Sequence, residues 1–338
     1  MNWYLETGKE SDVVKSTRIR FLRNIKGFKF KLNKEEQEEL ENKIKENLYS
    51  IGYGLKFLKL KDMDNITKTS LVEKNLISSN FLVKKGNSGS ILINDEENIC
   101  IMIGGEDNLS IQVFSSGLEL ENTLNLAIEI EEKIGNILGY SINKKYGYLT
   151  SNLSDLGTAL KVSVMVNLPA LSKTGNLRAL INTIRDFNVE ICGEYGKVTK
   201  NNINNEETIF QISNKQTLGI TEKEIIQNIK VITEKIIEQE RKARKMLTKE
   251  SLELEDLIWR SYGILTNCRK ISYEEAKELI TNIKIGTDLG LIDNLTDLKI
   301  QKLYLYTKPA NLQKYLGEKY DKVDQEIKRA EIIKQIIK

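Results

Sequence analysis

The stretch ICIMIGGEDNLSIQV, residues 99–113, constrains the fold more than any other part of the chain. Its first five residues are an unbroken apolar run, which predicts a buried strand, and residues 109–113 alternate in polarity, which predicts a half-buried strand. The loop between them contains two glycines and two adjacent carboxylates, Glu106 and Asp107. Loops at the ends of rigid strands often contain the catalytic or binding residues of a protein. The alternative is an ordinary hairpin loop with two solvated acids.

Histidine is absent from all 338 residues, and this narrows the chemistry that the chain can perform. Ser-His-Asp and Cys-His catalysis, histidine metal sites and histidine pH switches are excluded. Acid–base work must therefore fall to Asp, Glu, Lys, Tyr or Cys. The 51 basic and 48 acidic residues give a net charge of only +3, which argues against a dedicated nucleic-acid binder.

The three cysteines, Cys100, Cys192 and Cys268, are far apart and form no C-x-x-C pair, so no metal site is predicted. An odd number of cysteines without a signal peptide is typical of a reducing cytosol, so a cytoplasmic location is expected. No apolar run approaches the roughly 20 residues that cross a bilayer.

The remaining patterns predict an α+β fold with a mostly antiparallel sheet flanked by helices, followed by an all-helical region. Residues 1–12 are expected to be a loose arm. Residues 159–168 are interpreted as a helix that ends at Pro169, and the polar loop before it as an anion site. A change in composition places the boundary between residues 1–245 and 246–338.

Arg18 and Arg20 are two residues apart near the N-terminus. If residues 12–24 are extended, both side chains lie on one face and form a fork for phosphate or carboxylate. If this segment is helical, the side chains diverge. A solvated basic turn is the other reading.

Several segments resemble one family in the same order along nearly the whole chain. The opening ESD and STRIRFLRN, residues 10–12 and 16–24, resembles the "ESD…SSRIRLARN" opening of bacterial protein arginine kinases of the McsB type, which are relatives of the creatine and arginine kinases. Further similar segments are VEKNLIS at 72–78, GYLTS at 147–151, IFQISN at 209–214, RSYG at 260–263 and GTDLG at 286–290.

The resemblance implies an ATP:guanido phosphotransferase catalytic fold over residues 1–245 and a helical C-terminal domain over 246–338. It implies transfer of the ATP γ-phosphate, with Mg²⁺, to arginine side chains of proteins in the stress response. The implied partners are substrates with an exposed arginine, an activator protein, a heat-shock repressor and a Clp-type unfoldase, and a homodimer is left open. No membrane is implied.

The resemblance also assigns roles to individual residues. Glu106 corresponds to the catalytic base of the family's "NEEDH" loop. The nucleotide-binding positions that it implies are Ser16, Thr17, Arg18, Ile19, Arg20, Lys161, Val162, Ser163, Val164 and Met165. Arg329 corresponds to the second arginine of the phosphoarginine-binding "RDxxRA" motif, and a solvated helix charge is the alternative reading.

Several family positions carry a different residue here. Asn75 and Asn108 replace histidines, Asn152 replaces a reactive cysteine, and Gly105 replaces a glutamate. Ser110, Lys161 and Cys192 replace arginines, and Glu194 adds an acid to the phosphate loop. Three hypotheses follow. The first is a working protein arginine kinase with a divergent nucleotide site, and the second is a catalytically reduced relative that acts as a regulatory or adaptor protein. The third, a small-molecule guanidino kinase, is weaker.

Overall fold

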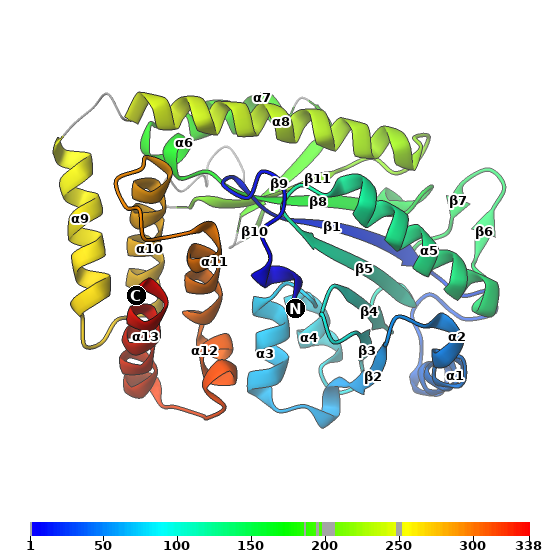
Figure 1. Cartoon of the computed structure of the whole chain (residues 1–338). Coiled ribbons are helices and arrows are strands. Elements are labelled where there is room, and N and C mark those ends of the chain that lie inside the picture. Colours follow the sequence, from blue (N-terminus) through cyan, green and yellow to red (C-terminus); the bar gives the residue numbers. More distant parts are fainter. Residues whose placement is uncertain (1, 186, 194–195, 198–206, 248–251) are drawn as a thin grey trace.

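The computed structural model describes residues 2–185, 187–193, 196–197, 207–247 and 252–338. Within these ranges no helix is both long and apolar enough to span a bilayer. Figure 1 shows a large twisted sheet with helices on both sides and a group of C-terminal helices at one end.

The sheet has nine strands in the order β10-β9-β11-β8-β1-β5-β4-β3-β2, and every neighbouring pair is antiparallel. The predicted antiparallel sheet is therefore confirmed. In this order the strands are Gly196–Lys197, Val189–Gly193, Ile209–Asn214, Leu160–Asn167, Val14–Arg23, Leu109–Ser116, Ile99–Ile103, Ser90–Ile93 and Lys56–Lys59. A small separate hairpin is formed by β6 (Ile142–Asn143) and β7 (Gly147–Tyr148).

One face of the sheet is apolar because β-branched residues occupy every second position of its strands. Ile19, Val113 and Val164 are completely buried on this face. Helices α5 (Leu120–Leu138) and α8 (Glu222–Leu247) cover it, with α7 (Leu177–Arg185) beside β9. Burial of this face supplies the larger of the two hydrophobic cores.

The opposite face is divided into two regions. Over β3 to β5 it supports a second core around Phe81, Met102 and Phe114, which α3 (Asn65–Glu73) and α4 (Ser79–Lys85) help to cover. Helices α1 (Lys34–Glu46) and α2 (Leu48–Ile51) lie near the β2 end (Figure 1), and their buried residues Leu40, Ile44 and Ile51 belong to the larger core of the apolar face. Over β1, β8, β11 and β9 the same face carries polar side chains.

The C-terminal helices are α9 (Leu252–Asn267), α10 (Tyr273–Asp288), α11 (Asp297–Tyr306), α12 (Pro309–Leu316) and α13 (Lys322–Ile337). They join the rest of the molecule through α12 against α3 and α10 against α6 (Pro169–Lys173). The Glu73 carboxylate accepts hydrogen bonds from the backbone N–H groups of Ala310 and Asn311, at 2.9 and 2.8 Å, and so caps α12. Helix α8 runs to Leu247, and the domain boundary near residue 245 stays a prediction.

Two interpretations of local structure were wrong. Residues 159–168 do not form a helix: Leu160–Asn167 is strand β8, because Leu160, Val162, Val164 and Val166 recur every second residue and fill the core. Pro169 begins α6 instead of ending a helix. The N-terminal arm is also not loose, since Trp3 is buried in the short 3₁₀ helix Trp3–Leu5 and stacks on Phe114 with ring centroids 5.3 Å apart.

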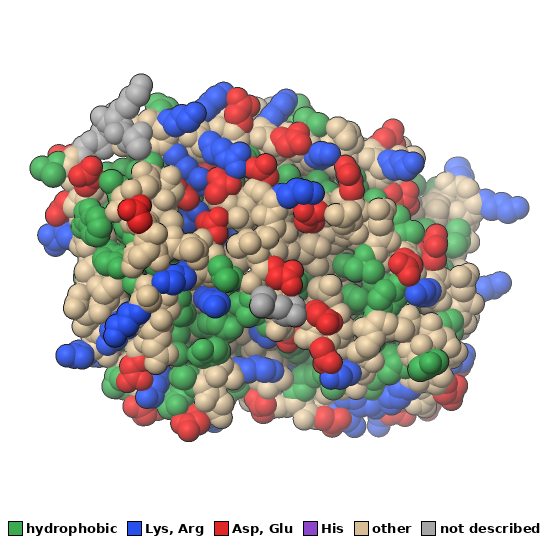
Figure 2. All heavy atoms as spheres, viewed as in Figure 1, with side chains coloured by type: hydrophobic (Ala, Val, Ile, Leu, Met, Phe, Trp, Pro, Cys, Tyr) green, Lys and Arg blue, Asp and Glu red, His purple; other side chains and the backbone are tan. Residues whose placement is uncertain are grey.

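Surface charges are intermixed over the face shown in Figure 2, where basic and acidic side chains alternate along α8 at the top of the view. This mixture agrees with the small net charge of +3. Because the two signs alternate, this helix presents no continuous patch of positive or negative charge.

Candidate functional site

Arg18 and Arg20 lie on one face of β1, as the extended reading of this segment predicts. Arg20 lies opposite Lys161 on β8 and Gln112 on β5, and Arg18 lies opposite Ser163 and Phe114. Because side chains alternate along a strand, these residues all face the polar side of the sheet. We call this surface over β1, β8, β11 and β9, together with the adjoining Ser110 and Gln112 of β5, the cleft face.

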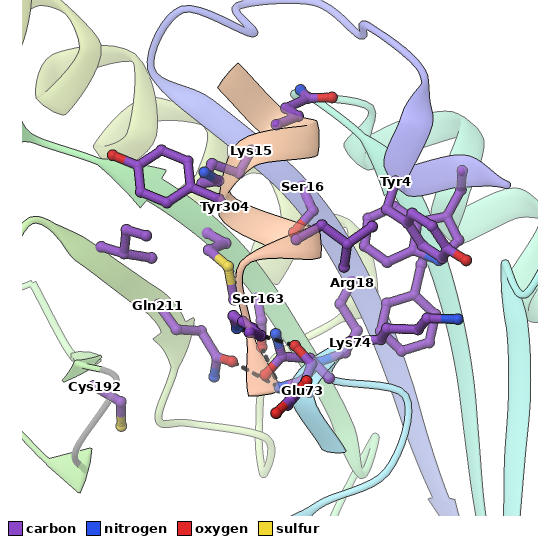
Figure 3. Close-up of a pocket in the computed structure, with 18 of the residues that line it drawn as sticks. Tyr4, Lys15, Ser16, Arg18, Glu73, Lys74, Ser163, Cys192, Gln211 and Tyr304 are labelled. Carbon is purple, nitrogen blue, oxygen red and sulfur yellow. Dashed lines mark hydrogen bonds between the residues drawn. The ribbon is translucent and has the colours of Figure 1, made fainter. Parts of the chain in front are cut away.

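Arg18 is held at the middle of the cleft face. One terminal nitrogen donates to Gln211 Oε1 at 3.0 Å and to Ser163 Oγ at 3.5 Å. Figure 3 shows Arg18 and Gln211 reaching toward each other from β1 and β11. Burial and the neighbouring Arg20 guanidinium lower the pKa of Arg18 to about 9, so it keeps its charge at neutral pH.

Arg20 lies among carboxylates. Burial lowers the pKa of its guanidinium, and the negative charges of Asp155, Asp107, Glu106 and Glu190 act in the opposite direction. The Glu106 loop is therefore close enough to act electrostatically on Arg20. The assignment of the arginine pair and Glu106 to one catalytic site stays a prediction.

Five polar atoms on the cleft face lack hydrogen-bond partners among the described residues, although solvent does not reach them. They are Nε of Arg18, Nε of Arg20, Oγ of Ser110, Oγ of Ser213 and Oδ1 of Asn167. The register of β1, β5, β8 and β11 places all five residues on this face. Buried polar atoms are almost always hydrogen-bonded, so this surface is suited to a polar ligand, and its two guanidiniums favour an anion.

The nucleotide-binding positions that the resemblance implies divide between the two faces. Side chains of six, namely Ser16, Arg18, Arg20, Lys161, Ser163 and Met165, project from the cleft face. The other four, Thr17, Ile19, Val162 and Val164, are completely buried on the apolar face. Their side chains support the sheet and do not reach a ligand on the cleft face.

Lys161 already has a partner. Its Nζ lies 3.0 Å from Glu190 Oε2, and both side chains are largely buried. Lys161 carries a charge where the family has an arginine fork, and here Glu190 offsets that charge. A phosphate at this position must compete with Glu190.

Glu106 lies in the loop between β4 and β5, and its side chain is half exposed. It accepts from Lys84 Nζ at 3.1 Å and from the amides of Asn80 and Asn152, both at 3.3 Å. The hydrogen bond from Lys84 is the main cause that lowers the pKa of Glu106. The carboxylate is therefore ionised, accessible and surrounded by donors, as a base for a cationic substrate requires.

Asp107 has a different, structural environment. It is buried, and its Oδ1 accepts from Asn24 Nδ2 and from the backbone N–H of Ser151, both at 2.7 Å. Next to it, Asn108 accepts from the backbone N–H of Ile25 at 2.9 Å and donates to the carbonyls of Lys29 and Phe30. These bonds fix the loop on which Glu106 is carried.

The replaced family positions surround the same cleft. Asn75 lines the cavity described below and has a left-handed backbone with φ of 61°, a conformation that asparagine tolerates. Asn152 contacts Glu106, and Gly105 lies beside it in the loop. Ser110 and Cys192 face the cleft from β5 and β9. Glu194 lies outside the described residues.

A cavity of about 250 Å³ opens where the cleft face meets the C-terminal helices. Ser16, Arg18 and Met165 line it from the sheet, and Gln301, Tyr304 and Leu305 line it from α11. Figure 3 shows Tyr304 on its helix above Ser16 and Ser163, with Lys74 and Glu73 near Arg18.

Arg329 lies apart from this cleft, within the C-terminal helices. It is only 3% exposed, and its guanidinium donates to the carbonyls of Thr307 at 2.7 Å and Ile271 at 3.0 Å. The reading of Arg329 as a solvated helix charge is therefore wrong. Its assignment to phosphoarginine binding stays a prediction, while its contacts tie α13 to the segments around it.

Sequence reasoning missed several members of the site. Asp155, in the 3₁₀ helix Leu153–Asp155, acts on Arg20 and Lys161, and burial raises its pKa. Gln211 and Glu190 project from β11 and β9, and the alternation of side chains along a strand is the signal for their direction. Lys84 and Asn80 approach Glu106 only through tertiary folding, and no local pattern marks them.

Two family models match the chain. The ATP:guanido phosphotransferase C-terminal catalytic domain matches residues 36–243, and the protein-arginine kinase McsB C-terminal domain matches residues 251–338. Among curated proteins, a protein-arginine kinase of Listeria welshimeri is 38% identical over 337 residues, which are 99% of this chain and 96% of that protein. One of Halothermothrix orenii is also 38% identical, over 98% of this chain and 95% of that protein.

Solved structures share the fold. A lombricine kinase has a TM-score of 0.56 at 23% identity, over 73% of this chain and 70% of that one. A duplicated taurocyamine kinase of Schistosoma mansoni, solved with transition-state analogue components, has a TM-score of 0.55 at 25% identity. That match covers 68% of this chain and 33% of the taurocyamine kinase.

Proposed function

Because the chain belongs to the protein-arginine kinases of the ATP:guanido phosphotransferase family, we propose that it transfers the γ-phosphate of ATP to arginine side chains of proteins. The observation that carries this proposal is the arginine pair on the cleft face. Arg18 and Arg20 present buried nitrogens without partners among the described residues, and Glu106 lies at one end of the pair. Cations for a phosphate chain and a carboxylate for a guanidinium are what this transfer needs.

The phosphates of ATP would lie along Arg18 and Arg20, and the substrate guanidinium against Glu106. A nitrogen of that guanidinium attacks the γ-phosphorus, and the bond from this phosphorus to the β,γ-bridging oxygen breaks. The electron pair of the broken bond leaves with ADP, and the proton displaced from the nitrogen passes to Glu106. No histidine exists to replace this base.

Mg²⁺ fits this arrangement as an ion held mainly by the phosphates. The described residues contain no cluster of three or more acidic or cysteine side chains that would form a protein cage. Mg²⁺ in nucleotide sites uses one or two carboxylates together with phosphate oxygens. Asp155, on which the charges of Arg20 and Lys161 act, would supply such a carboxylate. When bound, Mg²⁺ would neutralise charge on the triphosphate.

A second candidate function is a catalytically reduced relative that regulates or adapts other proteins. The specific observation in its favour is that three positions where the family has an arginine no longer offer a free guanidinium to the phosphates. Ser110 and Cys192 carry no positive charge, and Lys161 is paired with Glu190. Each preorganised charge contact that is missing from a transition state costs about 10²–10³ in rate.

We further propose the cellular setting that the family resemblance implies. The protein would act in the cytoplasm in the stress response, with an activator protein, a heat-shock repressor and a Clp-type unfoldase as its partners. Its substrates would be proteins with an exposed arginine, and its own assembly a homodimer. Co-purification from stressed cells, followed by identification of the bound proteins, tests this setting.

The experiment that separates the two functions measures acid-labile phosphoarginine. The protein is incubated with Mg²⁺, radiolabelled ATP and an unfolded arginine-rich protein, beside Glu106→Gln and a control, Glu38→Gln, on an exposed position of α1. A kinase gives label in wild type and control and none in Glu106→Gln. No label in any of the three, with ATP binding intact, supports the regulatory function instead.

A further inference from the structure

The cavity at the end of the cleft face is built by two parts of the chain that are distant in sequence. Ser16, Arg18 and Met165 form the sheet side, and Gln301, Tyr304 and Leu305 of α11 form the opposite wall. The two sides are also in direct contact, since Lys15 Nζ lies 3.7 Å from the centre of the Tyr304 ring. The C-terminal helices therefore border the same cleft as the arginine pair.

The direction of β1 decides which end of a nucleotide this wall meets. Arg23, at the end of β1, pairs with Leu109, next to the loop that carries Glu106. Lys15, near its beginning, contacts α11. Arg20 and Ser16 are four residues apart, which is roughly 13 Å along a strand. Since the γ-phosphate must lie near the guanidinium at Glu106, the triphosphate extends along Arg20 and Arg18 toward Ser16.

The nucleoside then reaches the cavity beside α11. Met165 and Leu305 line it from opposite sides with apolar surface, which suits a flat base. Gln301 also lines it, and Gln301 Oε1 is buried without a hydrogen-bond partner among the described residues. An amide oxygen accepts hydrogen bonds, so its complement is a donor such as the exocyclic amino group of adenine.

We propose that α11 forms the outer wall of the nucleoside subsite, with Gln301 accepting a hydrogen bond from the exocyclic amino group of the base. This inference rests on the proposed function, since it concerns the ATP of the same reaction. A bound ATP then contacts both the sheet and the C-terminal helices, whereas its phosphates contact the sheet alone. The C-terminal helices thereby contribute to the choice of nucleotide.

The test compares three ligands by calorimetry in the presence of Mg²⁺: ATP, inosine triphosphate, whose base lacks the amino group, and inorganic tripolyphosphate. They are titrated into the wild type, Gln301→Leu and a matched control, Gln335→Leu, on an exposed position of α13. We expect Gln301→Leu to weaken ATP about tenfold, the usual effect of one lost hydrogen bond with a buried partner. Binding of inosine triphosphate and of tripolyphosphate is expected to be unchanged, and the control to match the wild type.

Equal ATP affinity in wild type and Gln301→Leu would overturn the inference. Equal weakening of all three ligands would also overturn it, because it would indicate a general disturbance of the cleft. So would a wild type that binds none of them. A protein that binds ATP through Gln301 and forms no phosphoarginine keeps this inference and rejects the kinase function, so the two failures are distinguishable.

Discussion

Lys84 Nζ, from the last turn of α4, lies 3.1 Å from Oε1 of Glu106 in the loop between β4 and β5. The ammonium group meets the carboxylate where a substrate guanidinium is proposed to bind, and it stabilises the ionised form of Glu106. Its hydrogen bond is the main cause of the lowered pKa of that carboxyl group.

Lys84→Met is expected to move the acidic limb of the pH–rate profile to higher pH. Without the ammonium, the pKa of Glu106 rises toward its usual value, so a larger fraction of the base is protonated at a given acidic pH. At pH values well above both pKa values the protonation of Glu106 no longer differs. The measurement is kcat/KM for arginine phosphorylation against pH, which reports ionisations of the free enzyme. An unchanged acidic limb would show that Glu106 is not the titrating base.

Glu106→Gln is expected to abolish phosphotransfer and leave stability nearly unchanged. A general base contributes about 10²–10⁴-fold to the rate, and glutamine keeps the size of the side chain without its charge. Because the side chain is half exposed, the free energy of unfolding should change by less than about 0.5 kcal/mol. Kinetics and urea unfolding of the same sample measure both quantities.

Asp107→Asn provides the contrasting variant. Its carboxylate accepts from Asn24 and from the backbone of Ser151, so we expect it to lower stability more than Glu106→Gln and the rate less. A rate loss in Asp107→Asn equal to that in Glu106→Gln, at unchanged stability, would contradict the division of roles between the two acids.

Restoring arginine at Ser110, Lys161 and Cys192 together is expected to raise affinity for ATP. The strand register places all three on the cleft face with Arg18 and Arg20. Each added guanidinium can donate two parallel hydrogen bonds to a phosphate group. We expect the Kd for ATP with Mg²⁺ to fall at least about tenfold. Lys144→Arg, on an exposed position, is the control for added guanidinium. An unchanged Kd in the triple variant would mean that these positions do not meet the phosphates.

Arg329→Met is expected to destabilise the C-terminal helices. The change removes the guanidinium that donates hydrogen bonds to the carbonyls of Thr307 and Ile271. Both buried carbonyl groups then lose that hydrogen bond. Unsatisfied buried groups of this kind cost about 1–3 kcal/mol each, so we expect a loss of about 2–4 kcal/mol in chemical denaturation. Arg260→Met, at an exposed position of α9, should change stability little. Full stability of Arg329→Met combined with lost phosphoarginine binding would favour the family role instead.

Local patterns were sufficient for much of the fold. The pairs Asn33 with Glu36 and Ser272 with Glu275 have the spacing that is typical of a helix N-terminus, and both N-caps are present, in α1 and α10. The spacing of Arg18 and Arg20 predicted a shared face because alternation along a strand is a local property.

One error concerns a local pattern. In residues 160–167 the β-branched Val162, Val164 and Val166 recur at every second position, which favours a strand, and the helix interpretation gave this pattern too little weight. The other features that the sequence did not indicate depend on tertiary contacts. The pairing of Lys161 with Glu190 joins two strands through long-range contacts. The Arg329 contacts likewise join residues 22 and 58 positions away, and no local sequence pattern indicates them.

Calorimetry of ATP with Mg²⁺ tests the central claim, that Arg18 and Arg20 hold the phosphates on the cleft face. The samples are the wild type, Arg18→Gln, Arg20→Gln and a control, Arg260→Gln, on the surface of α9. We predict saturable binding in wild type and control, and at least about tenfold weaker binding in each cleft variant, since a charge-assisted hydrogen bond to phosphate is lost. Equal affinity in all four proteins would place the nucleotide elsewhere and contradict the assignment of this face.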